Sequence, residues 1–98
     1  MKKVAAKKND AVDAVLDRLR EENSYALLAD GFENALVGIC YRAGQPPLAA
    51  YDIEACLGIL VMNGMGQEEA EEYFHYNTLG SWLGENTPVF MSFPKRLK

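Results

Sequence analysis

The sequence has little with which to build a metal or nucleophilic site, since its 98 residues include one histidine and two cysteines. Zinc and other transition metals need several converging His, Cys or carboxylate ligands, and neither an H-E-x-x-H motif nor a paired C-x-x-C motif occurs. We therefore expect no metal and no cofactor. His75 follows Tyr73 and Phe74 in an acidic, helix-like stretch, and we interpret it as a partly exposed helix residue.

The two cysteines, Cys40 and Cys56, both lie among apolar neighbours, where a thiolate is disfavoured. A catalytic serine or cysteine also needs a base beside it, and His75 has no recognisable partner in the sequence. Nothing else indicates an oxidising compartment, so we predict free, buried thiols rather than a disulfide. We expect that the protein is not an enzyme.

Long hydrophobic runs are also missing. The longest apolar stretches, residues 55–62 and 35–41, are far shorter than the roughly 20 residues that cross a bilayer. The basic N-terminus resembles the start of a secretory signal, but Asn9, Asp10 and Asp13 follow where an apolar segment would be needed. We expect no membrane span and a cytoplasmic location.

Basic residues are scarce in the body of the chain. Between Glu21 and Phe93 the sequence has one basic residue, Arg42, against eleven acidic ones. Such a body repels phosphate backbones, so we do not expect it to bind nucleic acid. Only the basic ends could contact phosphate, through Lys2, Lys3, Lys7, Lys8, Lys95, Arg96 and Lys98.

The composition is that of one folded domain, with 49% hydrophobic and 24% charged residues. Residues 1–9 are polar and basic without periodicity, and we interpret them as a mobile basic arm. Residues 10–93 form the predicted domain, and residues 94–98 form a basic C-terminal tail.

The periodicity predicts an α+β domain. Apolar residues recur at helical spacing over residues 10–22, and residues 35–41 and 48–51 predict a hairpin around the turn residues 44–47. Asp52 is placed to cap a second helix over residues 53–62. We predict a small antiparallel or mixed sheet of about three strands, with about three helices packed on one face.

A third helix is predicted from Gly66 to about Asn77, with Ala70, Tyr73 and Phe74 on its buried side and Asn77 as a further candidate for that side. Residues 87–93 alternate as a final strand, in which Phe90 faces the side opposite to Val89, Met91 and Phe93.

The best candidate for a binding surface is the segment of residues 80–87, where Trp82 stands between two glycines. Its candidate binding residues are Trp82, Glu85 and Asn86. A simpler interpretation, which we favour, is that Trp82 closes the core while Asn86 and Thr87 satisfy the backbone of the turn.

A second candidate surface is the acidic start of the third helix. Carboxylates in a first helical turn are favoured by the helix dipole, so we interpret them as a solvated face rather than an acid/base pair. The candidate binding residues here are Glu68, Glu69 and Glu72, with Glu71 between them.

Several segments between Leu28 and Met91 together resemble a family of small uncharacterised proteins of phages, prophages and bacteria. The resemblance implies no particular activity. Gly66 departs from the pattern, because the family tends to have a serine or threonine cap there. The segments are Phe32-Glu33-Asn34-Ala35-Leu36-Val37-Gly38-Ile39, Ala50-Tyr51-Asp52 with Cys56, Ile59-Leu60-Val61-Met62, Glu68-Glu69-Ala70, Glu72-Tyr73-Phe74, Asn77-Thr78-Leu79-Gly80 and Gly84-Glu85-Asn86-Thr87-Pro88-Val89-Phe90.

Three functional hypotheses follow. The first is a non-enzymatic protein-binding module, accessory or host-modulating, whose acidic body meets a partner with a basic surface. The second is a small ligand-binding protein or enzyme that gathers polar residues at loop ends, namely Asp30, Glu33, Tyr51, Asp52, Glu85 and Asn86. The third is a structural homo-oligomer, such as a homodimer that buries Met62, Met65, Trp82 and Phe90.

Overall fold

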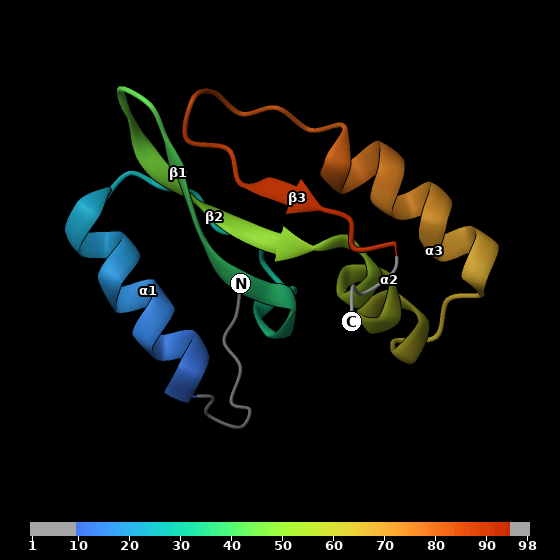
Figure 1. Ribbon diagram of the computed structural model, residues 1–98. Helices are drawn as coiled ribbons and strands as arrows, with labels where there is room; N and C mark the ends of the chain where they lie inside the picture. The colour runs from blue at the N-terminus through green and yellow to red at the C-terminus, as the bar shows by residue number, and fades with distance from the viewer. Residues whose placement is uncertain (1–9, 95–98) are drawn as a thin grey trace.

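The computed structural model describes residues 10–94, drawn in colour in Figure 1. The basic arm at residues 1–9 and the tail beyond Pro94 lie outside the described residues. Among residues 10–94, no helix is long and apolar enough to cross a membrane. The elements in chain order are α1 (Asp10–Glu22), the 3-10 turn η1 (Glu33–Ala35), β1 (Leu36–Arg42), β2 (Gln45–Asp52), α2 (Ile53–Met62), α3 (Gln67–Phe74), the π-helical turn η2 (His75–Leu79) and β3 (Val89–Met91).

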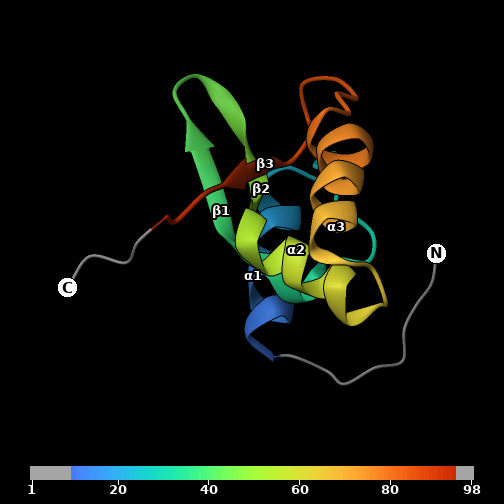
Figure 2. The same cartoon turned by 90° about the vertical axis from the view of Figure 1, so that its right-hand side faces the viewer.

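The three strands form one mixed sheet in the order β1-β2-β3. Strand β2 is central, antiparallel to β1 and parallel to β3. Helices α1, α2 and α3 lie on one side of this sheet, as the turned view in Figure 2 shows. The predicted α+β architecture is confirmed, and the sheet is of the mixed kind.

The hairpin turns at Gly44, whose φ of +69° lies in the left-handed region that favours glycine. Pro46 and Pro47 stand at the start of β2, before the residues that pair with β3. A proline lacks the N–H that a ladder hydrogen bond needs, so this end of β2 is where two prolines are tolerated. The Arg42 guanidinium donates to the Pro46 carbonyl and ties the two strand ends together.

Local signals fix the ends of α2. The Asp52 carboxylate accepts hydrogen bonds from the backbone N–H groups of Glu54 at 2.9 Å and Ala55 at 3.4 Å, which caps the helix as its sequence predicted. The helix ends at Met62, and Gly64 then turns the chain with a φ of +112°.

The last strand is shorter than the predicted residues 87–93, because it covers only Val89–Met91. Thr87 serves the preceding loop instead: its hydroxyl accepts from the Leu83 N–H at 2.8 Å and donates to the Gly84 carbonyl at 2.7 Å. Pro88 has no N–H to contribute to a ladder. The pairing of the last strand with β2 therefore begins at Val89, opposite Ala50.

Four aromatic rings connect the layers of the core. Phe90 of β3 stacks on Tyr51 of β2 at 5.6 Å between centroids, and it meets Phe74 of α3 edge to face at 5.4 Å. Phe74 in turn meets Phe32 at 6.1 Å. Edge-to-face and offset contacts of this kind are favourable beyond the area they bury. The buried core residues are Leu19, Phe32, Ala35, Ala49, Tyr51, Cys56, Leu60, Ala70 and Phe74.

A buried asparagine joins three segments that are distant in the sequence. Asn23, which follows α1, is only 8% exposed. Its Nδ2 donates to the Pro47 carbonyl at 2.9 Å and to Asn86 Oδ1 at 3.0 Å, and its Oδ1 accepts from the Tyr25 N–H at 3.0 Å. The end of α1, the start of β2 and the loop before β3 are thereby fixed together.

Candidate functional site

Trp82 does not close the core, so the interpretation favoured from the sequence is wrong on this point. Its side chain is 74% exposed. The core beneath the loop is already closed by Phe90, which packs against Tyr51 and Phe74. The part of that interpretation that concerned Thr87 is confirmed, because its hydroxyl satisfies the Leu83 N–H and the Gly84 carbonyl.

Trp82 belongs to a stretch of exposed apolar side chains. Tyr76 is 74% exposed and Leu83 is 69% exposed, with Leu79 between them also exposed. Isolated exposed apolar residues are ordinary on a protein surface, whereas several together indicate a contact site. We refer to Tyr76, Leu79, Trp82 and Leu83 as the apolar segment.

The other two candidates on this loop have different roles. Glu85 is exposed. Asn86 is engaged within the fold, because its Oδ1 accepts from Asn23 and its carbonyl accepts from the Leu27 N–H at 3.0 Å. Asn86 therefore positions the loop rather than offering a free side chain to a partner.

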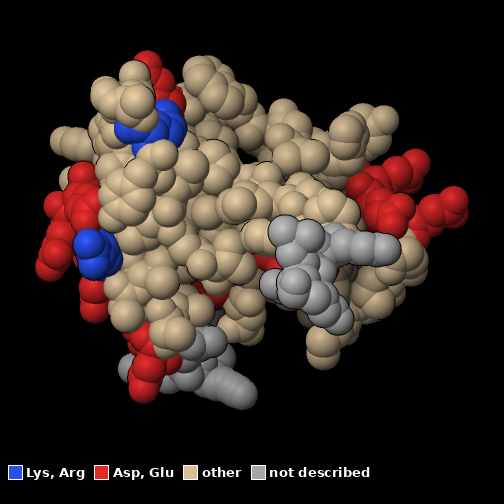
Figure 3. All heavy atoms as spheres, in the orientation of Figure 1, with Lys and Arg blue, Asp and Glu red and all other residues tan. Residues whose placement is uncertain are grey.

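The acidic candidates Glu68, Glu69 and Glu72 are all exposed on α3, as predicted for a solvated helix face. Glu69 accepts from the Gly66 N–H at 3.4 Å, and Glu71 accepts from Gln67 Nε2 at 2.9 Å, so these two support the helix start. The four carboxylates line a shallow depression with His75 and Tyr76. Acidic side chains gather over α3 and over α1 in Figure 3, with an uncharged surface between them.

Three of the exposed candidate side chains are thus not tied down within the fold by a hydrogen bond or ion pair in residues 10–94. Glu68 and Glu72 have no hydrogen bond or ion pair within residues 10–94, and Trp82 comes after the end of α3, beyond the π-helical turn η2. Within residues 10–94 no group of three or more His, Cys, Asp or Glu side chains could hold a metal ion. His75 is exposed and packs edge to face on Tyr76 at 5.0 Å.

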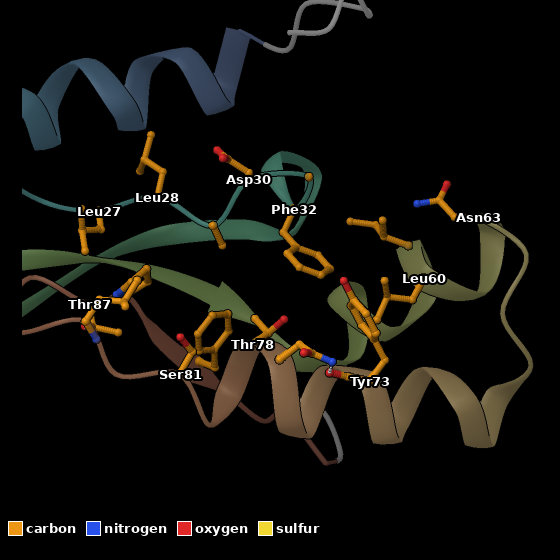
Figure 4. A pocket seen from close by; sticks show the side chains of 17 residues that line it. Leu27, Leu28, Asp30, Phe32, Leu60, Asn63, Tyr73, Thr78, Ser81 and Thr87 are labelled. Atoms are coloured by element: carbon orange, nitrogen blue, oxygen red, sulfur yellow. Dashed lines mark hydrogen bonds between the residues drawn. The ribbon is translucent and has the colours of Figure 1, made fainter. Parts of the chain in front are cut away.

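A groove of about 340 Å³ lies between the loop of residues 27–32 and the helical stretch from Tyr73 to Ser81. Figure 4 shows Leu27 on one bank and Tyr73, Thr78 and Ser81 on the other. Its apolar floor is formed by Phe32, Leu60 and Phe90. Its polar lining residues are Asp30, Asn63, Tyr73, Asn77, Thr78, Ser81 and Thr87.

The loop of residues 27–32, which forms one bank of the groove, is held by three hydrogen bonds that its backbone N–H groups donate. The Ala29 N–H donates to the Tyr51 hydroxyl at 2.9 Å, and the Leu27 N–H donates to the Asn86 carbonyl. The Phe32 N–H donates to the Ala29 carbonyl at 3.1 Å, which closes a turn around Gly31. A bank that is fixed at several points gives a preformed groove rather than one that must be ordered by its ligand.

The helical bank owes its shape to the π-helical turn η2. The extra residue in such a turn changes which side chains face the groove, so that Asn77 and Thr78 both line it together with Ser81. The Gly80 N–H donates to the His75 carbonyl at 2.9 Å, and a Cβ at Gly80 would lie 2.9 Å from that same oxygen. Glycine is therefore required where the turn ends.

The loop-end residues of the second hypothesis do not converge. Of that set only Asp30 lines the groove. Tyr51 is buried with its hydroxyl on Ala29, Asp52 caps α2, and Glu33 accepts from the Gly31 N–H at 3.3 Å. Burial raises the pKa of Tyr51 to about 12, so its phenol stays protonated at neutral pH.

The cysteines are both free, as predicted. Cys56 is buried, and burial raises the pKa of its thiol to about 12, which disfavours the reactive thiolate. Cys40 is only half-buried, so the prediction of two buried thiols is correct for Cys56 alone.

The groove was not predicted from the sequence. Tyr73 and Asn77 were assigned to the buried side of the third helix, but both are exposed and line the groove. The one available signal is the pair Leu27 and Leu28, apolar residues in a loop that neither a helix nor a strand accounts for.

Searches of protein-family models, curated proteins and solved structures found no match to this chain. The resemblance to small phage, prophage and bacterial proteins therefore stays a prediction. A function for the chain has to be proposed from the residues themselves.

Proposed function

We propose that this protein is a non-enzymatic protein-binding module whose partner carries a basic surface. The observation that carries the proposal is the exposure of Trp82 within the apolar segment, in the loop that follows α3 and η2. Tryptophan is enriched among the residues that dominate binding energy in protein interfaces. A large exposed indole that neither closes the core nor caps a turn is best explained as an interface anchor.

The acidic face supplies the second half of the proposal. Glu68 and Glu72 are exposed, lie four residues apart on one side of α3 and have no partner within residues 10–94. Charged residues at the rim of an interface speed encounter and select partners of opposite charge more than they add affinity. A basic partner would therefore associate faster with this face and use Trp82 as its anchor.

An accessory or host-modulating role in a phage or prophage, in the cytoplasm, belongs to this proposal and is supported by the resemblance of residues 28–91. The alternative of an enzyme or small-ligand protein is less well supported, because the loop-end residues that it needs are engaged within the fold. A homo-oligomer would also bury Trp82, so it is an outcome of the test below, but Phe90, which that hypothesis also used, packs in the core.

The test is an affinity pulldown from lysate of the host cell with the tagged full chain. Two variants remove the proposed contacts, Trp82→Ala and the double variant Glu68→Lys with Glu72→Lys. Two matched controls change similar residues elsewhere, Val37→Ala on β1 and the double variant Glu21→Lys with Glu54→Lys, all of them exposed.

We expect a stoichiometric partner that the wild type and both controls retain, and that the Trp82 and α3 variants lose. A partner retained equally by all variants would show that another surface binds. A wild type that forms a homodimer and captures nothing else would favour the structural homo-oligomer instead.

A further inference from the structure

Trp82 does not line the groove beneath loop 27–32, although its neighbour Leu83 in the apolar segment does. The groove combines an apolar floor with polar banks, as grooves that accept a single side chain of a partner commonly do. We propose that this groove receives an extended segment of the partner, in which a bulky apolar residue is flanked by lysine or arginine. The inference rests on the proposed function and names the chemistry of the partner.

The floor determines the apolar part of this segment. Phe32, Leu60 and Phe90 offer aromatic and aliphatic surface, and Phe32 and Leu60 are each only 7% exposed in the free protein. The cavity of about 340 Å³ has room for one large side chain with part of its backbone. An aliphatic or aromatic residue that fills it would remove the remaining apolar surface from water.

The banks fit the backbone of an extended segment. Thr78 and Ser81 stand on the helical bank, and neither side chain donates to or accepts from another group in residues 10–94. Asn77 uses its Nδ2 on the Tyr73 carbonyl at 3.1 Å and keeps its Oδ1 as an acceptor. Amide and hydroxyl groups in this arrangement can meet the N–H and C=O groups of a peptide.

The charge around the groove determines the flanking residues. Asp30 is the one charged residue that lines it, and its carboxylate turns outward at the rim, away from Tyr73 and Leu60 (Figure 4). Asp30 has no ion pair in the part of the chain that the structure describes. The helical bank continues from the acidic helix α3, and no Lys or Arg lines the groove. A long cationic side chain beside the inserted residue would meet the Asp30 carboxylate at the rim of the loop bank.

The experiment uses a library of random displayed peptides selected on the immobilised full chain, followed by affinity measurement with labelled peptides. We expect the selected sequences to share one bulky apolar residue next to Lys or Arg. Selection on the variant Asp30→Lys should shift the flanking preference to Asp or Glu, and that variant should bind the original peptide about threefold more weakly.

Two variants fill the groove, Thr78→Phe and Ser81→Phe, and Ser92→Phe adds the same ring on an exposed residue outside the groove. Circular dichroism and melting confirm that each is folded. Either groove variant should bind the selected peptide at least about tenfold more weakly, whereas Ser92→Phe should bind as the wild type does.

The inference is wrong if no peptide is enriched, if the enriched peptides lack a basic neighbour, or if folded groove variants bind them as tightly as the wild type. Dimerisation that Thr78→Phe abolishes would identify a second copy as the occupant and would also overturn it. The pulldown separates this failure from that of the proposed function. A cellular partner that Thr78→Phe and Asp30→Lys retain but Trp82→Ala loses leaves the binding module in place without the groove.

Discussion

Single side chains carry much of the tertiary organisation, and Asn23 is the clearest case. It donates to Pro47 and Asn86 and accepts from the Tyr25 N–H while nearly buried. We predict that Asn23→Ala lowers the free energy of unfolding by about 2–3 kcal/mol, because it leaves three polar groups without partners. Urea denaturation measures this loss.

The control for Asn23 is Asn34→Ala, which removes the same group from an exposed position. It should change the free energy of unfolding by less than about 0.5 kcal/mol. Equal effects of the two substitutions would contradict the role of Asn23 as the junction of three segments.

Tyr51 predicts how stability depends on alkaline pH. Burial, the largest cause, raises its pKa to about 12 in the folded protein, against about 10 when unfolded. The stabilisation that this pKa difference gives to the folded state is complete below pH 10. It is lost as the pH rises towards 12, because the Tyr51 hydroxyl of the unfolded state releases its proton first. We predict that Tyr51 alone accounts for a fall of about 1.4 kcal/mol in the free energy of unfolding by pH 11.

Urea denaturation of wild type and Tyr51→Phe at pH 8 and pH 11 checks this. The substitution should reduce stability at pH 8 by about 1 kcal/mol, since the Ala29 N–H loses its acceptor, and should flatten the fall towards pH 11. Tyr25→Phe, which changes an exposed tyrosine, serves as the control. An unchanged pH dependence in Tyr51→Phe would show that its hydroxyl is not the group responsible.

At the scale of the elements, alanine substitutions at two glycines should change stability in opposite directions. Gly80 ends the π-helical turn η2, and Gly58 lies within α2. Gly80→Ala should lower the free energy of unfolding by about 1–3 kcal/mol, since its Cβ would lie 2.9 Å from the His75 carbonyl oxygen. Gly58→Ala, within α2 and with open space around its Cβ, should raise it by about 0.5–1 kcal/mol.

Thermal melting followed by circular dichroism compares the two alanine variants directly. Opposite shifts in melting temperature are expected. If Gly80→Ala were as stable as the wild type, the turn would not require glycine, and the shape of the helical bank would have another cause.

The sequence predicted best those elements whose ends are determined by residues within or next to them. α1 and α2 have the predicted bounds, because periodicity, the Asp52 cap and the break at Asn63 and Gly64 lie within a few residues. The parallel pairing of β3 could not be predicted, since it depends on β2, which lies far away in the sequence. The π-helical turn and the groove also depend on how α3 meets loop 27–32.

The candidate site residues also fall into two groups, those whose exposure follows from nearby sequence and those whose surroundings depend on distant side chains. The exposure of Glu68, Glu69 and Glu72 follows from the amphipathic pattern of α3 alone. The exposure of Trp82 and the engagement of Asn86 depend on which other side chains reach them, here Phe90 in the core and Asn23 after α1. A sequence pattern does not decide between an aromatic residue that fills a core and one that anchors an interface.

For the whole molecule, the central claim is that Trp82 is an exposed anchor awaiting a partner. It is the only tryptophan, so fluorescence excited at a wavelength that the five tyrosines do not absorb reports on it alone. The measurement is acrylamide quenching of this emission, in the free protein over a range of concentrations and in complex with a captured partner. We predict that the free protein is quenched nearly as readily as a free indole at every concentration, and that the partner protects it. A blue-shifted, protected emission in the free protein would contradict the claim, and protection that increases with protein concentration would identify a second copy as the partner.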